Sequence, residues 1–216
     1  MIGLGIVNSF GMNKPAASTG TPASLTAVGT TVAGNVTLDS ITGVTNYLEK
    51  NGSSATITNN IATKLTAAEI SNFGFYGGAA DANSVASGVT LTWTGATGGT
   101  GTIPSGNDAA VWRAIGCSNS VESGVTATVK ADTTVRRIRV YGRAISFGGN
   151  SGLSCRCTLN DGSGLTQTLT QATQASVYFE FTFNANASAQ TMTIQLFPVS
   201  LGSTPQIGIA AITYGT

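Results

Sequence analysis

The sequence contains no histidine, and only 9% of its 216 residues are charged. Without histidine the chain has no Ser-His-Asp triad, no Cys-His dyad and no histidine-ligated zinc. Ten lysines and arginines balance nine acidic residues, which leaves a formal net charge of +1. A protein that neutralises nucleic-acid phosphates needs a large basic excess. The composition therefore excludes nucleic acid as a partner and leaves a neutral chain.

Cysteine and long apolar runs are also scarce. The three cysteines are Cys117, Cys155 and Cys157, an odd number that argues against a disulfide framework. Cys155 and Cys157 share one face of a strand, and we expect them to be small buried side chains. No run approaches the roughly 18 apolar residues that span a bilayer, and the N-terminus lacks the basic segment of a signal peptide. We expect no membrane span, and synthesis in a reducing cytoplasm.

The chain is rich in glycine, with 28 residues, and in threonine, serine and alanine. Three zones can be separated along it. Residues 1–20 form an apolar arm, residues 21–85 a small-residue-rich adaptor or stalk region, and residues 86–216 a domain of regular strands.

The arm alternates apolar residues with glycine. Exposed on a monomer, its large side chains would form an adhesive apolar patch. We expect the arm to dock either on another chain or on its own fold. The residues of this attachment arm are Ile2, Leu4, Ile6, Val7 and Phe10.

The zone from 21 to 85 has weak periodicity. Residues 30–38 resemble a strand with a turn at Gly34-Asn35. Residues 66–69 have the form of a helix capping box, with room for two turns before Gly74. Helical spacing also relates Ile41, Val44, Tyr47 and Leu48. Two short helices are the expectation for this zone, although β-branched residues are abundant in it.

Residues 86–216 alternate apolar and polar side chains, as half-buried strands do. Gly/Asn/Ser turns separate about eight such runs, with no helix between them, which predicts an all-β fold: an antiparallel, jelly-roll-like β-sandwich. The expected strands cover residues 89–94, 110–115, 125–129, 135–141, 153–159, 177–183, 192–196 and 207–214. The expected core consists of Leu91, Trp93, Ile138, Val140, Cys155, Cys157, Leu159, Phe179, Phe181, Ile194 and Leu196.

Candidate catalytic groups are few. Asp132 and Asp161 both stand in turn sequences, where an aspartate caps its own backbone. Glu180 alternates with Phe179 and Phe181 and should face solvent or a neighbouring arginine. The glycine-rich segments 98–101 and 148–150 are typical of hairpin turns rather than of phosphate-binding loops. We expect no catalytic, metal or cofactor site.

The arginines are the one concentrated feature, because five of the six lie between residues 136 and 156. Strand parity places most of them on one sheet face, together with a tyrosine. Such a face suits an anionic sugar or a carboxylate-bearing partner, through the planar fork of arginine. The alternative is a solvated or inter-subunit face, with arginines paired to Glu180 and Asp132. The candidate face consists of Arg137, Arg139, Tyr141, Arg143 and Arg156.

Three segments occur in an order that resembles a β-sandwich module of bacteriophage virion proteins, of tail-fibre or adhesin type, and of bacterial surface proteins. They are GVTATVKADTTVRRIRVY at 124–141, LSCRCTLNDGSG at 153–164 and SAQTMTIQL at 188–196. The opening MIGLGIVNSFG is similar to the glycine-alternating starts of some phage tail fibres. Where that module has aliphatic or small residues, this chain has Arg137, Arg139, Cys155 and Cys157.

The resemblance implies a non-enzymatic virion protein: a short tail fibre, adhesin or fibre adaptor that attaches through its N-terminus and projects its sandwich. Closed symmetric oligomers are the rule for assemblies of this kind, and we expect a homotrimer. The alternatives are a capsid decoration protein, a carbohydrate-binding module for a host surface glycan, and a polysaccharide hydrolase.

Overall fold

Every regular element in the described part of the chain is a β-strand. The computed structural model describes residues 21–32, 36–37, 44–50, 61–64, 69–85, 91–96, 99–103, 111–115, 123–145, 152–173, 175–199 and 206–216. None of these ranges holds a helix that could cross a membrane. The expected arm, with Ile2, Leu4, Ile6, Val7 and Phe10, lies outside the described residues.

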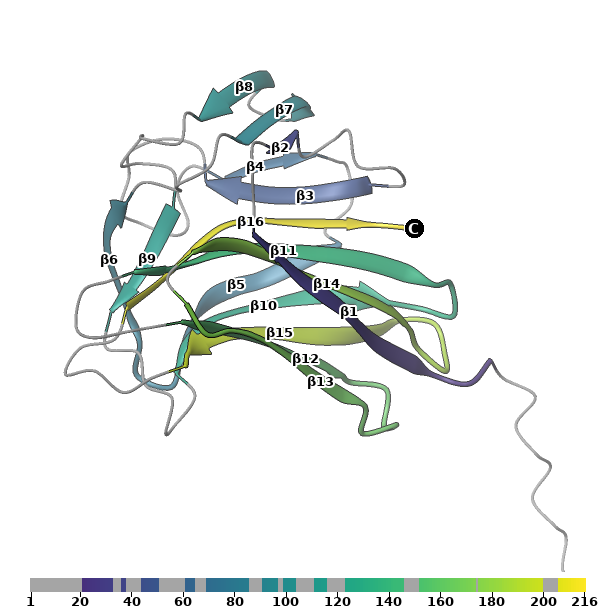
Figure 1. The fold of residues 1–216 in the computed structure, drawn as a ribbon. Coiled ribbons are helices and arrows are strands. Elements are labelled where there is room, and N and C mark those ends of the chain that lie inside the picture. The colour runs from purple at the N-terminus through teal and green to yellow at the C-terminus, as the bar shows by residue number, and fades with distance from the viewer. Residues whose placement is uncertain are drawn as a thin grey trace, which may run out of the picture.

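The strands form three sheets (Figure 1). The eight-stranded sheet follows the order β1 (Ser24–Val32), β14 (Ser176–Asn184), β11 (Arg136–Ile145), β16 (Gln206–Gly215), β3 (Val44–Lys50) and β4 (Ile61–Lys64), with β9 (Val111–Ile115) on β16 and β6 (Ala80–Val85) on β9. The five-stranded sheet follows the order β13 (Thr166–Gln171), β12 (Leu153–Leu159), β15 (Gln190–Pro198), β10 (Gly124–Ala131) and β5 (Ile70–Tyr76). The small third sheet consists of β2 (Val36–Thr37), β7 (Leu91–Ala96) and β8 (Gly99–Ile103).

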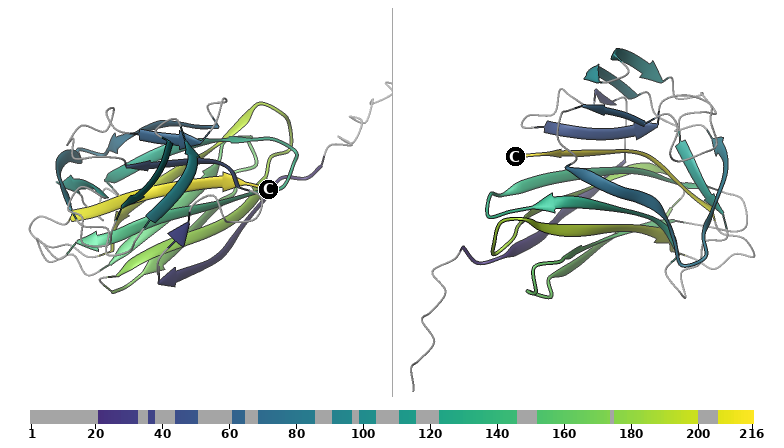
Figure 2. Two further views of the ribbon diagram at one scale, coloured as in Figure 1. Left: turned by 90° about the horizontal axis from the view of Figure 1, so that it is seen from above. Right: turned by 180° about the vertical axis from the view of Figure 1, so that it is seen from behind.

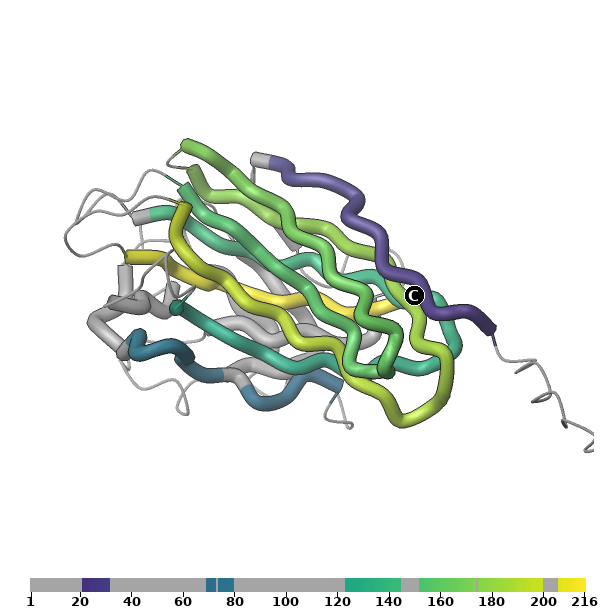
Figure 3. The backbone as a smooth tube through the Cα atoms, turned by 90° about the horizontal axis from the view of Figure 1, so that it is seen from below, coloured from purple at the N-terminus to yellow at the C-terminus, as the bar shows by residue number. Residues whose placement is uncertain are grey.

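Two of these sheets face each other and enclose the core. The strands of the five-stranded sheet run side by side (Figure 3), and the eight-stranded sheet forms the second layer (Figure 2). Among the described strands, every pairing except that of β2 with β7 is antiparallel. The expected all-β, antiparallel sandwich is therefore confirmed.

The core consists of the side chains that point inward from every second position of the strands. In β14 the buried Phe179, Phe181 and Phe183 point inward, while the residues between them are partly exposed. The facing strand β15 contributes Met192, Ile194 and Leu196, all buried. Of the expected core, the following are buried: Ile138, Val140, Cys155, Cys157, Leu159, Phe179, Phe181, Ile194 and Leu196. The side chains of Leu91 and Trp93 lie outside the described part.

Both helices expected before residue 85 are wrong. Residues 44–50 form β3, which pairs with the buried strand β16, and residues 70–76 form β5 at the edge of the five-stranded sheet. Pairing with a strand of the sandwich satisfies the backbone and outweighs weak helical spacing in segments that carry valine, isoleucine and aromatic residues. The boundary expected at residue 86 does not separate these strands from the sandwich, because β1, β3 and β5 are hydrogen-bonded to β14, β16 and β10.

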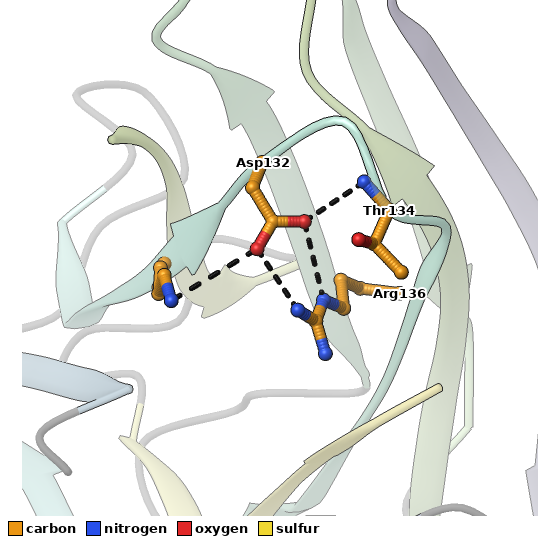
Figure 4. A network of polar contacts seen from close by, with 4 residues as sticks. Asp132, Thr134 and Arg136 are labelled. Carbon is orange, nitrogen blue, oxygen red and sulfur yellow. Dashed lines mark hydrogen bonds and ion pairs between the residues drawn. The ribbon is translucent and has the colours of Figure 1, made fainter. Parts of the chain in front are cut away.

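The hairpin between β10 and β11 is closed by Asp132 (Figure 4). One carboxylate oxygen accepts a hydrogen bond from the Thr134 backbone N–H at 2.8 Å, and the other accepts one from Arg136 Nη2 at 2.9 Å. Lys130 Nζ lies 3.9 Å from the same oxygen as Arg136. The hydrogen bond from Arg136 holds the pKa of Asp132 below its ordinary value, although burial opposes the shift. The expected turn-capping role of Asp132 and its pairing with an arginine are confirmed.

We expect Asp132→Asn to lower the free energy of unfolding by up to about 1 kcal/mol at neutral pH, since the lost ion pair is close to the surface. The folded-state pKa is lowered, so the carboxylate stabilises the protein above its ordinary pKa of 3.8 and loses that effect as the pH falls through the folded-state value. Urea unfolding from pH 7 to pH 2 should show the two proteins converging in acid. A constant difference over that range would contradict this electrostatic role.

Candidate functional site

The candidate site lies on the outer face of the eight-stranded sheet, where β11 runs between β14 and β16. Ile138 and Val140 of β11 are buried in the core, so the alternate residues point to the opposite face. The register places Arg137 beside Thr182, Arg139 beside Glu180, and Tyr141 beside Tyr178. We call this side of the sheet the arginine–tyrosine face; it consists of Arg137, Arg139, Tyr141, Arg143, Tyr178, Glu180 and Thr213. Tyr141 and Thr213 are each only 2% exposed and lie below its surface.

Arg139 is held from two sides. Its Nε donates a hydrogen bond to Glu180 Oε2, and its guanidinium carbon lies 4.8 Å from the centre of the Tyr178 ring. The side chains of Arg139 and Glu180 are only 22% and 14% exposed. Although burial opposes it, the Glu180 carboxylate raises the pKa of Arg139 above its ordinary value. By geometry, no described side chain or backbone group accepts a hydrogen bond from Nη1 or Nη2 of Arg139, although Arg139 lies close enough to the Tyr141 hydroxyl to lower its pKa by hydrogen bonding.

Tyr141 lies beneath this pair. It is 2% exposed, and its ring centre is 5.5 Å from that of Tyr178, with the two rings tilted by 51°. Burial raises the pKa of Tyr141 to about 12, while the nearby Arg139 acts in the opposite direction. The hydroxyl is buried and makes no hydrogen bond of normal geometry with a described group, although the side chains of Arg139 and Thr213 lie close enough to lower its pKa by hydrogen bonding. A buried hydroxyl without a well-placed partner is costly.

We expect Tyr141→Phe to raise the free energy of unfolding by about 1 kcal/mol, because it removes a buried hydroxyl without a partner and keeps the packed ring. Thermal and urea unfolding of the unliganded protein measure the change. Tyr178→Phe is the matched control on the adjacent strand; its hydroxyl is not among the buried groups without a partner, and stability should stay within about 0.5 kcal/mol. A loss of stability in Tyr141→Phe would show that the hydroxyl is already satisfied within the fold.

The structure separates one expected member from the others. Arg156 lies on β12, in the five-stranded sheet, and its guanidinium donates to Gln195 Oε1 from Nε at 3.1 Å and from Nη2 at 2.8 Å. Its guanidinium carbon also lies 5.4 Å from the centre of the Phe197 ring. Strand parity predicts which side of its own sheet a side chain lies on, but it does not predict to which sheet the strand belongs. The expectation that all five residues share one face is therefore corrected for Arg156.

Two residues of the arginine–tyrosine face were not among the sequence candidates. Tyr178 occurs two residues before Glu180, and Thr213 lies on β16, opposite Arg139. The alternation of β14 is the signal that could have identified Tyr178. The placement of Thr213 depends on the pairing of β11 with β16, two strands about 70 residues apart in the sequence. The predicted pairing of Glu180 with an arginine is confirmed, and the arginine is Arg139.

The other candidate groups have structural roles. Asp161 accepts hydrogen bonds from the backbone N–H groups of Ser163 at 2.9 Å and Asn186 at 3.0 Å, so it joins two turns. Cys155 and Cys157 point into the core, and burial raises the pKa of the Cys157 thiol, which keeps it in the protonated form. The described residues contain no group of three potential metal ligands. Cys117 and the side chain of Trp112 lie outside the described part.

Comparisons with known proteins concern the fold. No protein-family model matches the chain, and no curated protein matches it in sequence. Similar solved structures include the xylan-binding CBM22-1 domain of Xyn10C from Paenibacillus barcinonensis, at 12% identity and a TM-score of 0.39 over 66% of this chain and 84% of that one.

A carbohydrate-binding module, TmCBM61 in complex with β-1,4-galactotriose, is similar at 8% identity and a TM-score of 0.33 over 91% of this chain and 90% of that one. The enzymatically active domain of tailspike protein 4 from bacteriophage CBA120 is similar at 10% identity and a TM-score of 0.32, over 90% of this chain and 19% of that one. The structural neighbours of this chain thus include carbohydrate-binding modules and a phage tailspike domain, at similarities that carry no argument about its ligand.

Proposed function

We propose that this protein binds a glycan through the arginine–tyrosine face and has no catalytic activity. The observation that carries the proposal is the arrangement around Arg139. A guanidinium is held in place by Glu180 and Tyr178, its terminal nitrogens make no hydrogen bond of normal geometry with a described residue, and the buried Tyr141 lies beneath it. Binding sites typically combine apolar or aromatic walls with a few convergent polar groups.

A saccharide fits these groups better than an apolar ligand does. Each sugar hydroxyl both donates and accepts hydrogen bonds, so it can accept from the terminal nitrogens of Arg139 and donate to a neighbouring acceptor. The half-buried Tyr178 ring offers an apolar edge to the C–H groups of a sugar. Because Arg139 is already fixed by Glu180, little side-chain entropy is lost when a ligand binds.

Three of the described carboxylates argue against hydrolysis. A glycosidase general acid needs a raised pKa. Arg136 lowers the pKa of Asp132, while the N–H groups of Ser163 and Asn186 lower that of Asp161 against the opposing effect of burial. Glu180 is paired with Arg139. These three residues are thus occupied as structural acceptors, which supports binding without turnover.

The place of action that we propose is a phage virion, where the sandwich projects as an adhesin or short tail fibre. The support is the apolar arm and the resemblance of residues 124–141, 153–164 and 188–196 to virion β-sandwich modules. In this account the arm binds another virion protein and the chain assembles as a homotrimer. Immunogold labelling separates tail from capsid decoration, and light scattering of the purified protein tests the trimer. A monodisperse monomer with an arm that no particle protects from protease would contradict this placement.

Arg139→Ala is the variant that tests glycan binding. We expect wild-type protein to bind at least one member of an array of bacterial surface polysaccharides, and Arg139→Ala to bind it at least about 10-fold more weakly, because charged hydrogen bonds are lost. Isothermal titration calorimetry measures the change. Arg156→Ala is the matched control, since Arg156 is a partly exposed arginine on the outer face of the other sheet. No binding by wild type across the array, or equal losses in both variants, would refute the proposed site.

A further inference from the structure

We infer that the glycan is acidic, and that Arg139 binds a carboxylate of the sugar through its two terminal nitrogens. The inference rests on the proposed function and names the ligand class for the same site. It depends on which edge of the guanidinium is occupied, on the charge of the surrounding face, and on the protonation of Tyr141.

A guanidinium presents five N–H groups in a rigid fork. Glu180 accepts from Nε, which uses the side of the fork nearest the strand. The end of the fork, formed by Nη1 and Nη2, makes no hydrogen bond of normal geometry with a described residue. Two parallel N–H groups at this end match the two oxygens of a carboxylate, and such bidentate bonds are stronger and more directional than bonds to a neutral hydroxyl.

The charge of the face favours an anion even though Glu180 lies beside Arg139. Among the side chains that the structure describes, the arginine–tyrosine face carries Arg137, Arg139 and Arg143 beside one carboxylate, that of Glu180. Further along the same rows, the register adds one acidic and one basic residue, Glu49 on β3 and Lys64 on β4. Arg137 is two residues from Arg139 on the same face, about 6.6 Å along the strand. It therefore contributes an attractive potential whatever hydrogen bonds it makes. Because the Arg139 side chain is only 22% exposed, solvent screens its charge less than it would screen a fully exposed charge.

Tyr141 keeps the base of the site uncharged. Burial raises its pKa to about 12, so the hydroxyl stays protonated at neutral pH and adds no negative charge beside Arg139. Because Tyr141 is only 2% exposed, the fork of Arg139 is the group that discriminates between acidic and neutral ligands.

Matched pairs of polysaccharides test the inference. The probes are polygalacturonate, hyaluronan, alginate and polysialic acid, each beside its carboxyl-reduced form, with poly-glutamate as a peptide that carries the same acid group. We expect wild type to bind the acidic member of at least one pair about 10-fold or more tightly than the reduced form. Added salt should reduce this preference.

Arg139→Lys is the decisive variant, because lysine keeps the charge and loses the fork. We expect it to lose most of the preference for the acidic polymer, while Arg156→Lys keeps that preference; circular dichroism verifies that both fold. Equal binding of acidic and reduced forms would overturn the inference and leave glycan binding standing. Binding of neither form, together with no binding on the array of surface polysaccharides, would remove the proposed function as well. Poly-glutamate bound as tightly as the best polysaccharide would overturn the inference in favour of a protein partner.

Discussion

Phe181→Ala is expected to lower the free energy of unfolding by about 3 to 5 kcal/mol, the range for large-to-small changes at fully buried aromatic positions. Phe181 is 0% exposed and lies in β14, between Ala27 of β1 and Ile138 of β11. The cavity left by the ring faces the five-stranded sheet, so it loosens the contact between the two layers. For a single domain this is a large fraction of the total stability.

Chemical denaturation followed by tyrosine and tryptophan fluorescence measures that loss. Thr182→Ala is the matched control, because Thr182 is the next residue of the same strand and faces outward, beside Thr26 and Arg137. Its effect should stay within about 0.5 kcal/mol. Similar losses for the two variants would show that the inward and outward faces of β14 are assigned wrongly.

Gly124→Ala is expected to cost about 1 to 3 kcal/mol, or to prevent folding, because the site has no room for a methyl group. A Cβ atom at Gly124 would lie 2.0 Å from the carbonyl oxygen of Leu196 and 2.9 Å from Cδ1 of Ile207. The first contact is with the backbone of the adjacent strand β15, which cannot move without breaking the ladder between β10 and β15. Glycine is therefore required at position 124 because strands β10 and β15 approach each other closely there.

Gly74→Ala is the control for that substitution. Gly74 lies on the adjacent strand β5, opposite Thr126, and a Cβ atom there would meet nothing within 4 Å. Since alanine restricts the unfolded chain, we expect Gly74→Ala to leave stability unchanged or to raise it by up to about 1 kcal/mol. Thermal unfolding of both variants gives the comparison. Equal stability of the two variants would contradict the close packing at Gly124.

The alternation of apolar and polar residues was sufficient to predict the strands that have one clearly apolar face. The alternation in β12, β14 and β15 predicted both the strands and their buried residues, because each strand covers the core with every second side chain. It failed for β13, whose sequence TQTLTQ has a single apolar residue, Leu169, at an exposed edge. It also failed for β3 and β5, where pairing with distant strands decides the conformation and local spacing does not.

The candidate site could be predicted only in part for a related reason. Parity within β11 correctly grouped Arg137, Arg139 and Tyr141, and the alternation of β14 turned Glu180 outward, toward solvent or an arginine. The assignment of Arg156 required knowledge of strand order, which a single sequence does not contain. The position of Tyr178 under the Arg139 guanidinium depends on the register of β14 against β11.

A chain of nearly neutral composition carries one arginine-rich sheet face. The chain is rich in threonine, serine and glycine and poor in charge, while β11 concentrates arginines on one sheet face. The sandwich fixes that strand between β14 and β16 and so orients Arg139, Tyr141 and Tyr178 without a ligand. A rigid polar site on a sheet is suited to recognition of an extended polymer, and this is the basis of the proposed glycan binding.

The most direct test of that claim is nuclear magnetic resonance of ¹⁵N-labelled protein titrated with the tightest-binding oligosaccharide from the polysaccharide pairs. We predict shifts of the Arg139 Nε–H signal and of the backbone amides of Tyr141, Tyr178 and Glu180, with the Arg156 Nε–H signal unchanged. Shifts centred on Arg156 and its neighbours in the five-stranded sheet, with Arg139 unmoved, would contradict the account and place the binding surface on the opposite side of the sandwich.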